Sequence, residues 1–313
     1  MNTNVKRKMD NVLYIVNPAA QGGSGAKTWE SFRAIWPAPI NPDQIIITEK
    51  PGHAREIAAA RNGCDIIAAV GGDGTAREVI SGIMDRQGMK PRVALIPCGT
   101  GNDIGREIGI FSVKDAVAAL QVGHARSFDL VRIDSSHDGV QRHGYGFLFG
   151  CVGFSANSMM RPWMKRLLGP KGAYFLTTFL QIFVYRAPHM TIRTGNRKFD
   201  ERIYMVIAGN AEWVSGGSMR MSPGAITDDG QLNITVVPSL SRLKIITRLF
   251  PRIASGAHIR EPGVSYFTEK TVEVHSNPPV IVEVDGDLFG KTPASLSICP
   301  GAVQIICFQS LVE

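Results

Sequence analysis

The chain has 313 residues, of which 44% are hydrophobic and 19% charged, and its mean hydropathy is +0.02. These values are typical of a folded soluble chain and leave room for two domains of moderate size. Its five cysteines form no C-x-x-C pair and have no neighbouring histidine cluster, which argues against a disulfide framework or a zinc site. The longest apolar stretch, Ala173 to Val184, is interrupted by polar residues and is too short for a membrane span. The N-terminus has too few apolar residues for a signal peptide, so we expect a cytoplasmic protein.

The net charge of +7 is spread unevenly along the chain. From Ser155 to Phe199 there are eight Lys or Arg and no acid, and from Asn233 to Arg260 there are five and again no acid. Such blocks favour an anionic partner, which can be nucleic acid, a membrane surface or a charged substrate. A solvated basic face without a partner is the alternative.

The first 128 residues alternate short apolar runs with helical stretches. Strands are predicted at 12–16, 44–48, 65–70 and 93–97, and helices at 26–36, 53–61, 75–85 and 113–122. Strands that are apolar throughout and separated by helices predict a parallel sheet covered on both faces. The first domain, residues 1–128, is therefore expected to be a Rossmann-like α/β domain.

After Asp129 the pattern changes to short alternating strands separated by turns, with few helices. Examples are MTIRT, RIYMVIAGN, LNITVV and TVEVHS. This pattern predicts a mostly antiparallel β-sandwich over residues 129–299, with the C-terminal segment at about 300–313 packing back on the first domain.

Three glycine-rich turns follow predicted strands of the first domain, at the edge of the sheet where ligands bind in open α/β folds. They begin at Asn17, Gly71 and Pro97. The first lacks both Walker glycines, and the second, GGDGT, has Arg77 where a Rossmann fingerprint needs its third glycine. An ordinary turn is the alternative for each alone. Together they favour a phosphate site, because glycines let an anion approach backbone N–H groups at a helix start.

Asp73 in GGDGT needs a separate explanation, because a carboxylate repels phosphate. It is acceptable in such a loop if it faces a divalent cation or takes a proton from an attacking hydroxyl. The residue types therefore indicate a reaction centre rather than a site that only stores phosphate.

GGDGTAREVISGI followed by PCGTGNDIGREIGI resembles the diacylglycerol-kinase catalytic domain shared by bacterial lipid kinases, sphingosine kinases and ceramide kinases. The family's early Asn-Pro pair matches Asn17-Pro18, its Thr after the second strand matches Thr48, and its His-Ala helix start matches His53-Ala54. Motifs in the second half, including SPGAITDDGQL and the Asp285-Gly286-Asp287 turn, follow in family order. The resemblance thus covers nearly the whole chain and implies an α/β domain related to NAD kinases and phosphofructokinases, with a β-sandwich after it.

The resemblance implies an ATP-dependent lipid kinase that uses Mg²⁺. It assigns Asp73 to the phosphates, through magnesium or as a base, and it places Asp103 and Asp129 beside it in an acidic cluster, Asp103 as a metal ligand and Asp129 toward the substrate. The residues that would bind ATP are Asn17, Thr48, Gly71, Gly72, Asp73, Gly74, Thr75, Ala76, Arg77, Glu78, Gly99, Thr100 and Asn102.

The resemblance also assigns two turns of the second domain. A metal would be bound at the D-D-G turn by Asp229, with carbonyl groups near Ile226 and Gln231. The proton acceptor would come from the family's D-G-E motif, which here is Asp285-Gly286-Asp287 and thus carries a carboxylate that is one methylene shorter. Catalysis is sensitive to shifts of about an ångström, so either the backbone compensates at Asp287 or Asp285 carries more of the role. The base is therefore one of Asp287, Asp285 and Asp73. A simple hairpin turn is the alternative.

Two basic segments favour a lipid surface as the partner. The segment 161–186 mixes aromatic and basic residues, and in the family it lies near the acyl-chain pocket. No RNP, KH or helix-turn-helix pattern is present, so no nucleic acid partner is expected. Over 241–254 a helical repeat places Lys244, Arg248 and Arg252 on one face, and Pro251 is expected to interrupt or kink the helix. The opposite stripe, which packs inward or lies on a bilayer, comprises Leu243, Ile246, Leu249, Phe250 and Ile253.

The sequence therefore predicts a kinase that phosphorylates a lipid hydroxyl at an anionic membrane surface, associated peripherally with the membrane. Diacylglycerol, a sphingoid base or ceramide would each fit as the acceptor. The alternatives are a soluble-substrate kinase of the NAD-kinase type and a non-catalytic lipid- or nucleotide-binding protein. The oligomeric state stays open, and a homodimer is compatible with the sequence.

Overall fold

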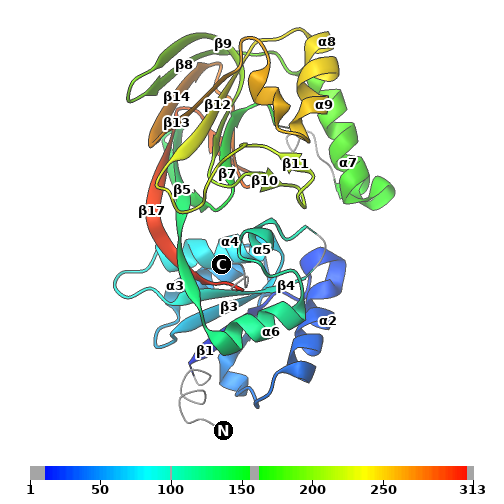
Figure 1. The fold of residues 1–313 in the computed structure, drawn as a ribbon, viewed down its shortest axis with the longest axis vertical. Coiled ribbons are helices and arrows are strands. Elements are labelled where there is room, and N and C mark those ends of the chain that lie inside the picture. The colour runs from blue at the N-terminus through cyan, green and yellow to red at the C-terminus, as the bar shows by residue number, and fades with distance from the viewer. Residues whose placement is uncertain (1–10, 99–100, 156–161, 309–313) are drawn as a thin grey trace. The chain divides into compact units, whose positions relative to one another are not determined.

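The computed structural model describes residues 11–98, 101–155 and 162–308 (Figure 1). The chain forms two compact units. Unit 1 comprises Met1–Asp129, Ser215–Gly217 and Gly301–Glu313, and unit 2 comprises Leu130–Val214 and Ser218–Pro300. The first division falls next to the boundary predicted after residue 128.

Unit 1 is built on a parallel sheet, as predicted from its apolar strands. The strand order is β17-β4-β3-β1-β2, and β1 and β3 are buried along their whole length. Helices α2 and α6 pack on each other, as do α3 and α4, and Figure 1 shows the sheet between these layers. The elements are β1 (Val12–Val16), α2 (Ala20–Ile35), η1 (Pro42–Gln44), β2 (Ile45–Ile47), α3 (His53–Ala60), β3 (Ile66–Gly71), α4 (Asp73–Met84), β4 (Arg92–Pro97), α5 (Asp103–Glu107), α6 (Val113–Val122) and the end of β17 (Ala294–Ile306).

Two local differences from the prediction lie near the glycine turns. Helix α2 begins at Ala20 rather than Ala26, but Gln21, Gly22 and Gly23 have positive φ, so its first turn is kinked. The short helix α5 was not predicted, because five residues are too few to show a helical repeat.

Unit 2 is mostly antiparallel, which confirms the predicted β-rich second domain. The long strand β9 pairs with β8 in its first half and with β7 and β12 in its second half. The elements are β5 (Ala125–His137), β6 (Val140–Gly146), β7 (Phe149–Gly153), α7 (Pro162–Val184), β8 (His189–Thr194), β9 (Lys198–Gly209), β10 (Trp213–Val214), β11 (Met219–Arg220), β12 (Leu232–Pro238), α8 (Arg242–Lys244), the π-helix η3 (Ile245–Leu249), α9 (Phe250–Ile253), η4 (Ala257–Arg260), β13 (Ser265–Glu269), β14 (Thr271–Asn277), β15 (Ile281–Val284), β16 (Asp287–Lys291) and β17.

The strands of unit 2 bury two different faces. Alternate residues such as Val282 and Val284 of β15 belong to a large aliphatic core. The other face carries a second cluster in which Tyr204 and Phe154 pack with Ile182 of α7 and with Ile245. Helices therefore cover this second face, and Figure 1 shows α7 beside α8 and α9.

The segment 242–253 is a continuous helix with a π turn in its middle. Pro251 has no N–H to donate, and the Phe250 N–H donates to Ile245 O, five residues back. The predicted apolar stripe is consequently wrong at its start: Leu243 is 71% exposed, and Ile245 is buried instead. Leu249 is buried as predicted.

Helix α7 was not predicted as a helix. It spans Pro162–Val184 with a kink at Gly169. Its length does not make it a membrane span, since none of the helices in the described residues is both long and apolar enough to cross a bilayer.

Candidate active site

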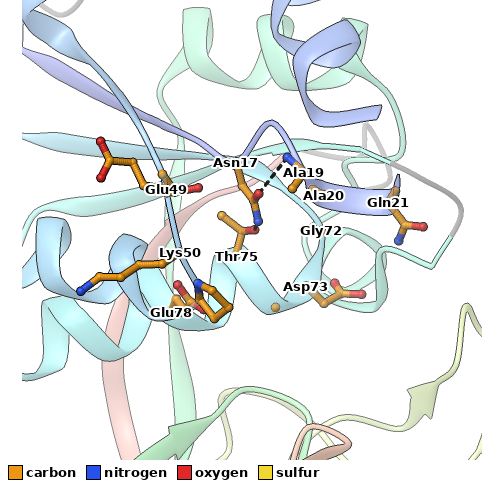
Figure 2. A pocket seen from close by; sticks show the side chains of 13 residues that line it. Asn17, Ala19, Ala20, Gln21, Glu49, Lys50, Gly72, Asp73, Thr75 and Glu78 are labelled. Carbon is orange, nitrogen blue, oxygen red and sulfur yellow. Dashed lines mark hydrogen bonds between the residues drawn. The ribbon is translucent and has the colours of Figure 1, made fainter. Parts of the chain in front are cut away.

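A cleft of about 490 Å³ lies at the carboxyl ends of the unit 1 strands (Figure 2). It is formed by the turn after β1, the turn after β2 and the start of α4, where the sequence predicts phosphate binding. The residues that line it are Asn17, Ala19, Ala20, Gln21, Thr48, Glu49, Lys50, Pro51, Gly72, Asp73, Gly74, Thr75 and Glu78.

Asn17 connects the first two glycine turns. Its Nδ2 donates to Thr75 Oγ1 at 2.9 Å, and its Oδ1 accepts from Ala19 N at 3.2 Å (Figure 2). Glu78 similarly accepts from Gly52 N at 2.9 Å, which connects α4 to the turn after β2. These hydrogen bonds fix the walls of the cleft without any ligand.

The glycines of GGDGT serve different purposes. A Cβ on Gly71 would lie 2.4 Å from Thr75 Oγ1, so packing requires glycine there. A Cβ on Gly74 would meet nothing within 4 Å, and one on Gly72 would make only ordinary contacts. Neither residue has a positive φ. Packing does not require glycine at Gly72 and Gly74, so their bare backbone leaves room for a ligand to approach closely.

Asp73 caps the helix that follows the third turn. Its Oδ2 accepts from Asp103 N and its Oδ1 accepts from Ile104 N, each at 3.0 Å. Burial raises the pKa of Asp73, and these two amides oppose the shift. The carboxylate therefore joins the second turn to the third through backbone donors.

Asp103 lies beside Asp73, and its carboxylate accepts hydrogen bonds from residues that are distant in the sequence. Its Oδ1 accepts from Gly216 N at 2.7 Å and from Gly217 N at 3.2 Å, and all three residues belong to unit 1. Burial and the neighbouring Asp73 raise the pKa of Asp103 to about 6. Two adjacent carboxyl groups with raised pKa values suit a site that receives positive charge.

Asp129 is buried, and its Oδ1 accepts from Gly301 N at 2.7 Å. Among the residues that the structure describes, no group of three or more His, Cys, Asp or Glu is close enough to bind a metal. The structure therefore pairs Asp73 with Asp103 and does not gather Asp129 with them.

Several residues predicted to bind the nucleotide do not line the cleft. Ala76 is buried in the core, and Asn102 is the N-cap of α5 with a positive φ. Gly71 and Arg77 also lie outside the lining, and the predictions for Gly99 and Thr100 fall outside the described residues.

Sequence reasoning missed three polar residues of the cleft, namely Gln21, Glu49 and Lys50. Lys50 brings a positive charge to the wall and forms an exposed ion pair with Glu56 at 3.1 Å. The sequence contains a signal for two of them: Glu49 and Lys50 directly follow Thr48 at the carboxyl end of a predicted strand, where ligands bind in open α/β folds.

The Asp285-Gly286-Asp287 turn gives its two carboxylates different surroundings. Asp285 has a φ of 47° and accepts from Phe147 N, Leu148 N and Phe149 N at 2.8–2.9 Å. Asp287 is exposed at the start of β16. Because Asp285 accepts from three backbone amides, its carboxylate holds the turn. Asp287 is the more accessible carboxylate of the two.

The predicted metal turn has oxygen donors of the right kind. Asp229 Oδ1 accepts from Gln231 N at 2.9 Å, and Ile226 is 55% exposed on the same loop. A carboxylate and backbone carbonyls are hard ligands that fit Mg²⁺.

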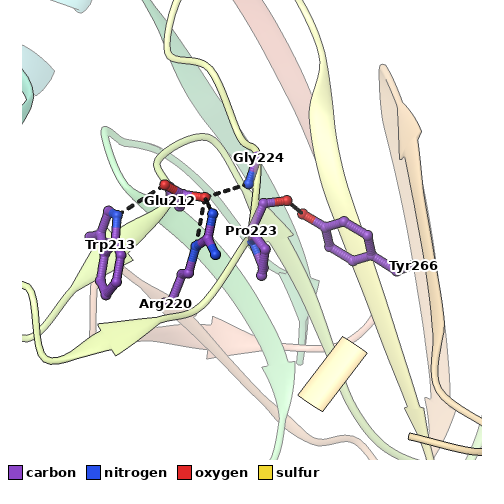
Figure 3. A network of polar contacts seen from close by, with 6 residues as sticks. All are labelled: Glu212, Trp213, Arg220, Pro223, Gly224 and Tyr266. Carbon is purple, nitrogen blue, oxygen red and sulfur yellow. Dashed lines mark hydrogen bonds and ion pairs between the residues drawn. The ribbon is translucent and has the colours of Figure 1, made fainter. Parts of the chain in front are cut away.

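Glu212 anchors the start of this loop within unit 2 (Figure 3). Its carboxylate accepts from Gly224 N at 2.6 Å and from Trp213 Nε1 at 2.9 Å, and it pairs with Arg220 at 2.6 Å. Tyr266 donates its hydroxyl to Pro223 O at 2.7 Å. Burial opposes ionisation, but the Gly224 amide and Arg220 prevail and lower the pKa of Glu212.

We expect Glu212→Gln to lower the free energy of unfolding by about 1–3 kcal/mol at neutral pH, since it removes a charged hydrogen-bond acceptor. The pKa is lowered by folding, so the stabilisation is present above the ordinary pKa of 4.5 and is lost as the pH falls below it. Urea unfolding of both proteins at several pH values measures the difference. Glu273→Gln, an exposed change on β14, is the control; a gap that persists unchanged in acid would contradict the assignment.

Unit 2 also contains an apolar cavity of about 100 Å³ on its helix-covered face. Its lining includes Leu249, Phe250 and Ile253 from the helical segment, and Glu283 and Gly286 from β15 and the turn after it. Other lining residues are Phe149, Cys151, Phe154, Tyr204, Met205, Ile207, Met219, Met221, Val237 and His258.

Comparison with known families matches both parts of the chain. Residues 11–133 match the diacylglycerol kinase catalytic domain, and residues 151–307 match the YegS C-terminal NAD kinase beta sandwich-like domain. A diacylglycerol kinase of Mycobacterium tuberculosis is 31% identical over 314 residues, covering 96% of each chain. A diacylglycerol kinase of Staphylococcus haemolyticus is 28% identical and covers 79% of this chain and 73% of its own.

Solved structures share the fold. A chain from Bacillus anthracis str. Sterne superposes with a TM-score of 0.75 at 22% identity, covering 97% of both chains. The crystal structure of a diacylglycerol kinase from the same organism gives a TM-score of 0.67 and covers 97% of this chain and 98% of its own. The structures show the shared fold, and the sequence matches establish that the chain belongs to the diacylglycerol kinase catalytic-domain family and is a kinase.

Proposed function

We propose that this kinase transfers the γ-phosphoryl group of ATP to the hydroxyl of a lipid and works at a membrane surface. The acceptor is a lipid alcohol such as diacylglycerol, a sphingoid base or ceramide. The observation that carries the proposal is the apolar cavity of unit 2, whose lining includes Gly286, next in the chain to the exposed Asp287.

The unit 1 cleft supports ATP as the donor. Gly72 and Gly74 present bare backbone with open space, which suits phosphate oxygens, and α4 begins at Asp73, so the positive end of its dipole lies at this turn. Lys50 and the polar side chains of Asn17 and Gln21 provide further contacts for a charged, polar ligand.

The unit 2 cavity supports a lipid as the acceptor. Its lining is dominated by aromatic, aliphatic and methionine side chains, which suit an acyl chain. The lining also includes Glu283, which accepts a hydrogen bond from Ser155 Oγ and adds a polar group to the cavity wall. An amphiphile with a buried chain and a hydroxyl near Asp287 fits this polarity.

In this proposal Asp287 accepts the proton of the lipid hydroxyl, and Asp285 positions the turn through its three amide contacts. Asp73 and Asp103 form the acidic pair of the nucleotide cleft. Mg²⁺ would neutralise charge on the phosphates and has fitting oxygen ligands at Asp103 and at the Asp229 turn with the carbonyls of Ile226 and Gln231.

The test is turnover of purified protein with labelled ATP, Mg²⁺ and a lipid panel, followed by identification of the product by mass spectrometry. We expect a phosphorylated lipid from wild type. Asp287→Asn should remain as stable as wild type and lose at least about 10²-fold in kcat, whereas Asp285→Asn should lose stability as well. Turnover restricted to a soluble alcohol, or an unchanged rate for Asp287→Asn, would refute the proposal.

A further inference from the structure

A second cavity of unit 2 lies outside the residues assigned to catalysis. It has a volume of about 420 Å³ and lies where the end of α7, strand β9 and the start of α8 meet. Three arginines from these three places line it: Arg186 follows α7, Arg202 belongs to β9, and Arg242 begins α8. Among the described residues that line the cavity there is no Asp or Glu.

The three arginines lack a protein anion. Within the described part of the chain, no carboxylate forms an ion pair with Arg186, Arg202 or Arg242. Arg202 Nη1 donates only to the carbonyl of Ala187, at 3.5 Å. Guanidinium groups brought to one cavity repel one another unless an anion lies between them. Arg252 differs, because it pairs with Glu261.

The backbone around the cavity is firmly held. Ser239 N donates to Arg202 O at 2.8 Å, and Ile203 N donates to Pro188 O at 3.1 Å. Ser241 caps α8 by accepting from Lys244 N. The three arginines are exposed, but the backbone on which they stand is held in place, which lowers the cost of binding a ligand.

The surroundings of the cavity favour a lipid as the carrier of the anion. Phe183 and Val184 precede Arg186 and are 44% and 66% exposed, and Leu243 follows Arg242 and is 71% exposed. Exposed apolar side chains next to arginines suit a bilayer interface, where the chains enter the acyl boundary and the guanidinium groups meet phosphates.

We propose that this cavity binds a phosphate-bearing anion, and that the anion is the headgroup of a phospholipid other than the one that is phosphorylated. Arginine matches phosphate geometry with paired N–H donors. The site would seat unit 2 on an anionic membrane through specific headgroup contacts rather than through its general positive charge. It does not depend on the proposed acceptor lipid.

The test compares sedimentation of the full chain with vesicles of phosphatidylcholine, with and without phosphatidylglycerol, and requires no turnover. Arg186→Gln and Arg242→Gln should each lower partitioning onto anionic vesicles about fivefold, and the double variant about 25-fold, from one cationic contact each. Arg193→Gln and Arg248→Gln remove the same charge elsewhere on unit 2 and should change it less than about twofold. Unfolding midpoints verify that all variants are folded.

A soluble arm identifies the source of the anion. If glycerol 3-phosphate neither binds nor competes with vesicles, the phosphate must come from a lipid headgroup. If glycerol 3-phosphate binds without vesicles and both pocket variants lose it, the cavity takes free phosphate compounds and the lipid part of the proposal is overturned. The site itself would be overturned if all four variants lost vesicle partitioning equally, or if Arg186→Gln and Arg242→Gln lost none. Kinase turnover in neutral detergent should be unchanged in the pocket variants, which separates this result from failure of the proposed activity.

Discussion

Asp73→Ala is expected to slow phosphoryl transfer strongly and to loosen the third glycine turn at the same time. The substitution removes the acceptor of the Asp103 and Ile104 amides, so α5 loses its cap. We expect kcat to fall about 10³-fold, the loss typical of a group that acts on the reacting charge, and the free energy of unfolding to fall by about 1–3 kcal/mol. Labelled-ATP turnover and urea unfolding measure the two effects.

Asp73→Asn separates the structural role from the chemical one. Asparagine keeps the shape and one acceptor oxygen, so it retains part of the cap but has no charge and cannot take a proton. We expect stability between those of wild type and Asp73→Ala, with activity as low as that of the alanine variant. A fully active Asp73→Asn protein would show that the carboxylate acts only as a cap.

Gly74→Ala is expected to weaken ATP binding strongly without harming the fold. The added methyl group meets no protein atom within 4 Å and lies in the first turn of α4, where alanine is favoured over glycine by about 1 kcal/mol. The free protein should therefore be at least as stable as wild type. A methyl group in the path of the phosphates costs about 1–3 kcal/mol, or roughly 5- to 150-fold in affinity, which calorimetry with a non-hydrolysable ATP analogue measures.

Gly71→Ala is the matched control for this prediction. Its Cβ would lie 2.4 Å from Thr75 Oγ1, so it should destabilise the folded protein even without nucleotide. If Gly74→Ala binds the analogue with the affinity of wild type, no ligand approaches that backbone, and the cleft does not bind phosphate at this turn.

The α/β unit could be predicted well because its strands are buried on both faces. The predicted run at 12–16 coincides with β1, and the run at 65–70 differs from β3 by one residue at each end. Helix α6 coincides with the predicted 113–122, because Ser112 caps its start and Gly123 its end. Where the spacing of apolar residues and the capping residues indicate the same bounds, the local sequence is enough to predict the helix.

The contacts of the site could be predicted only in part, because most of them use backbone donors. Asp73 was identified as important, but its partners are the amides of Asp103 and Ile104, which any residue except proline supplies. The same holds for Asp285 with the amides at 147–149 and for Asp103 with those at 216 and 217. A carboxylate that binds backbone amides leaves no pattern in the side chains of its partners. The sequence therefore could not show that Asp285 holds the turn while Asp287 is exposed.

The π turn before Pro251 adds one residue to a turn of the helix and so changes which side chains share a face before and after it. Residues on its two sides follow different registers, so basic residues before and after the turn have different neighbours. Arg242, ahead of the turn, lines the open cavity, whereas Arg252, beyond it, is neutralised by Glu261. The helix thus presents one positive charge to a possible ligand before the turn and pairs another inside the fold after it.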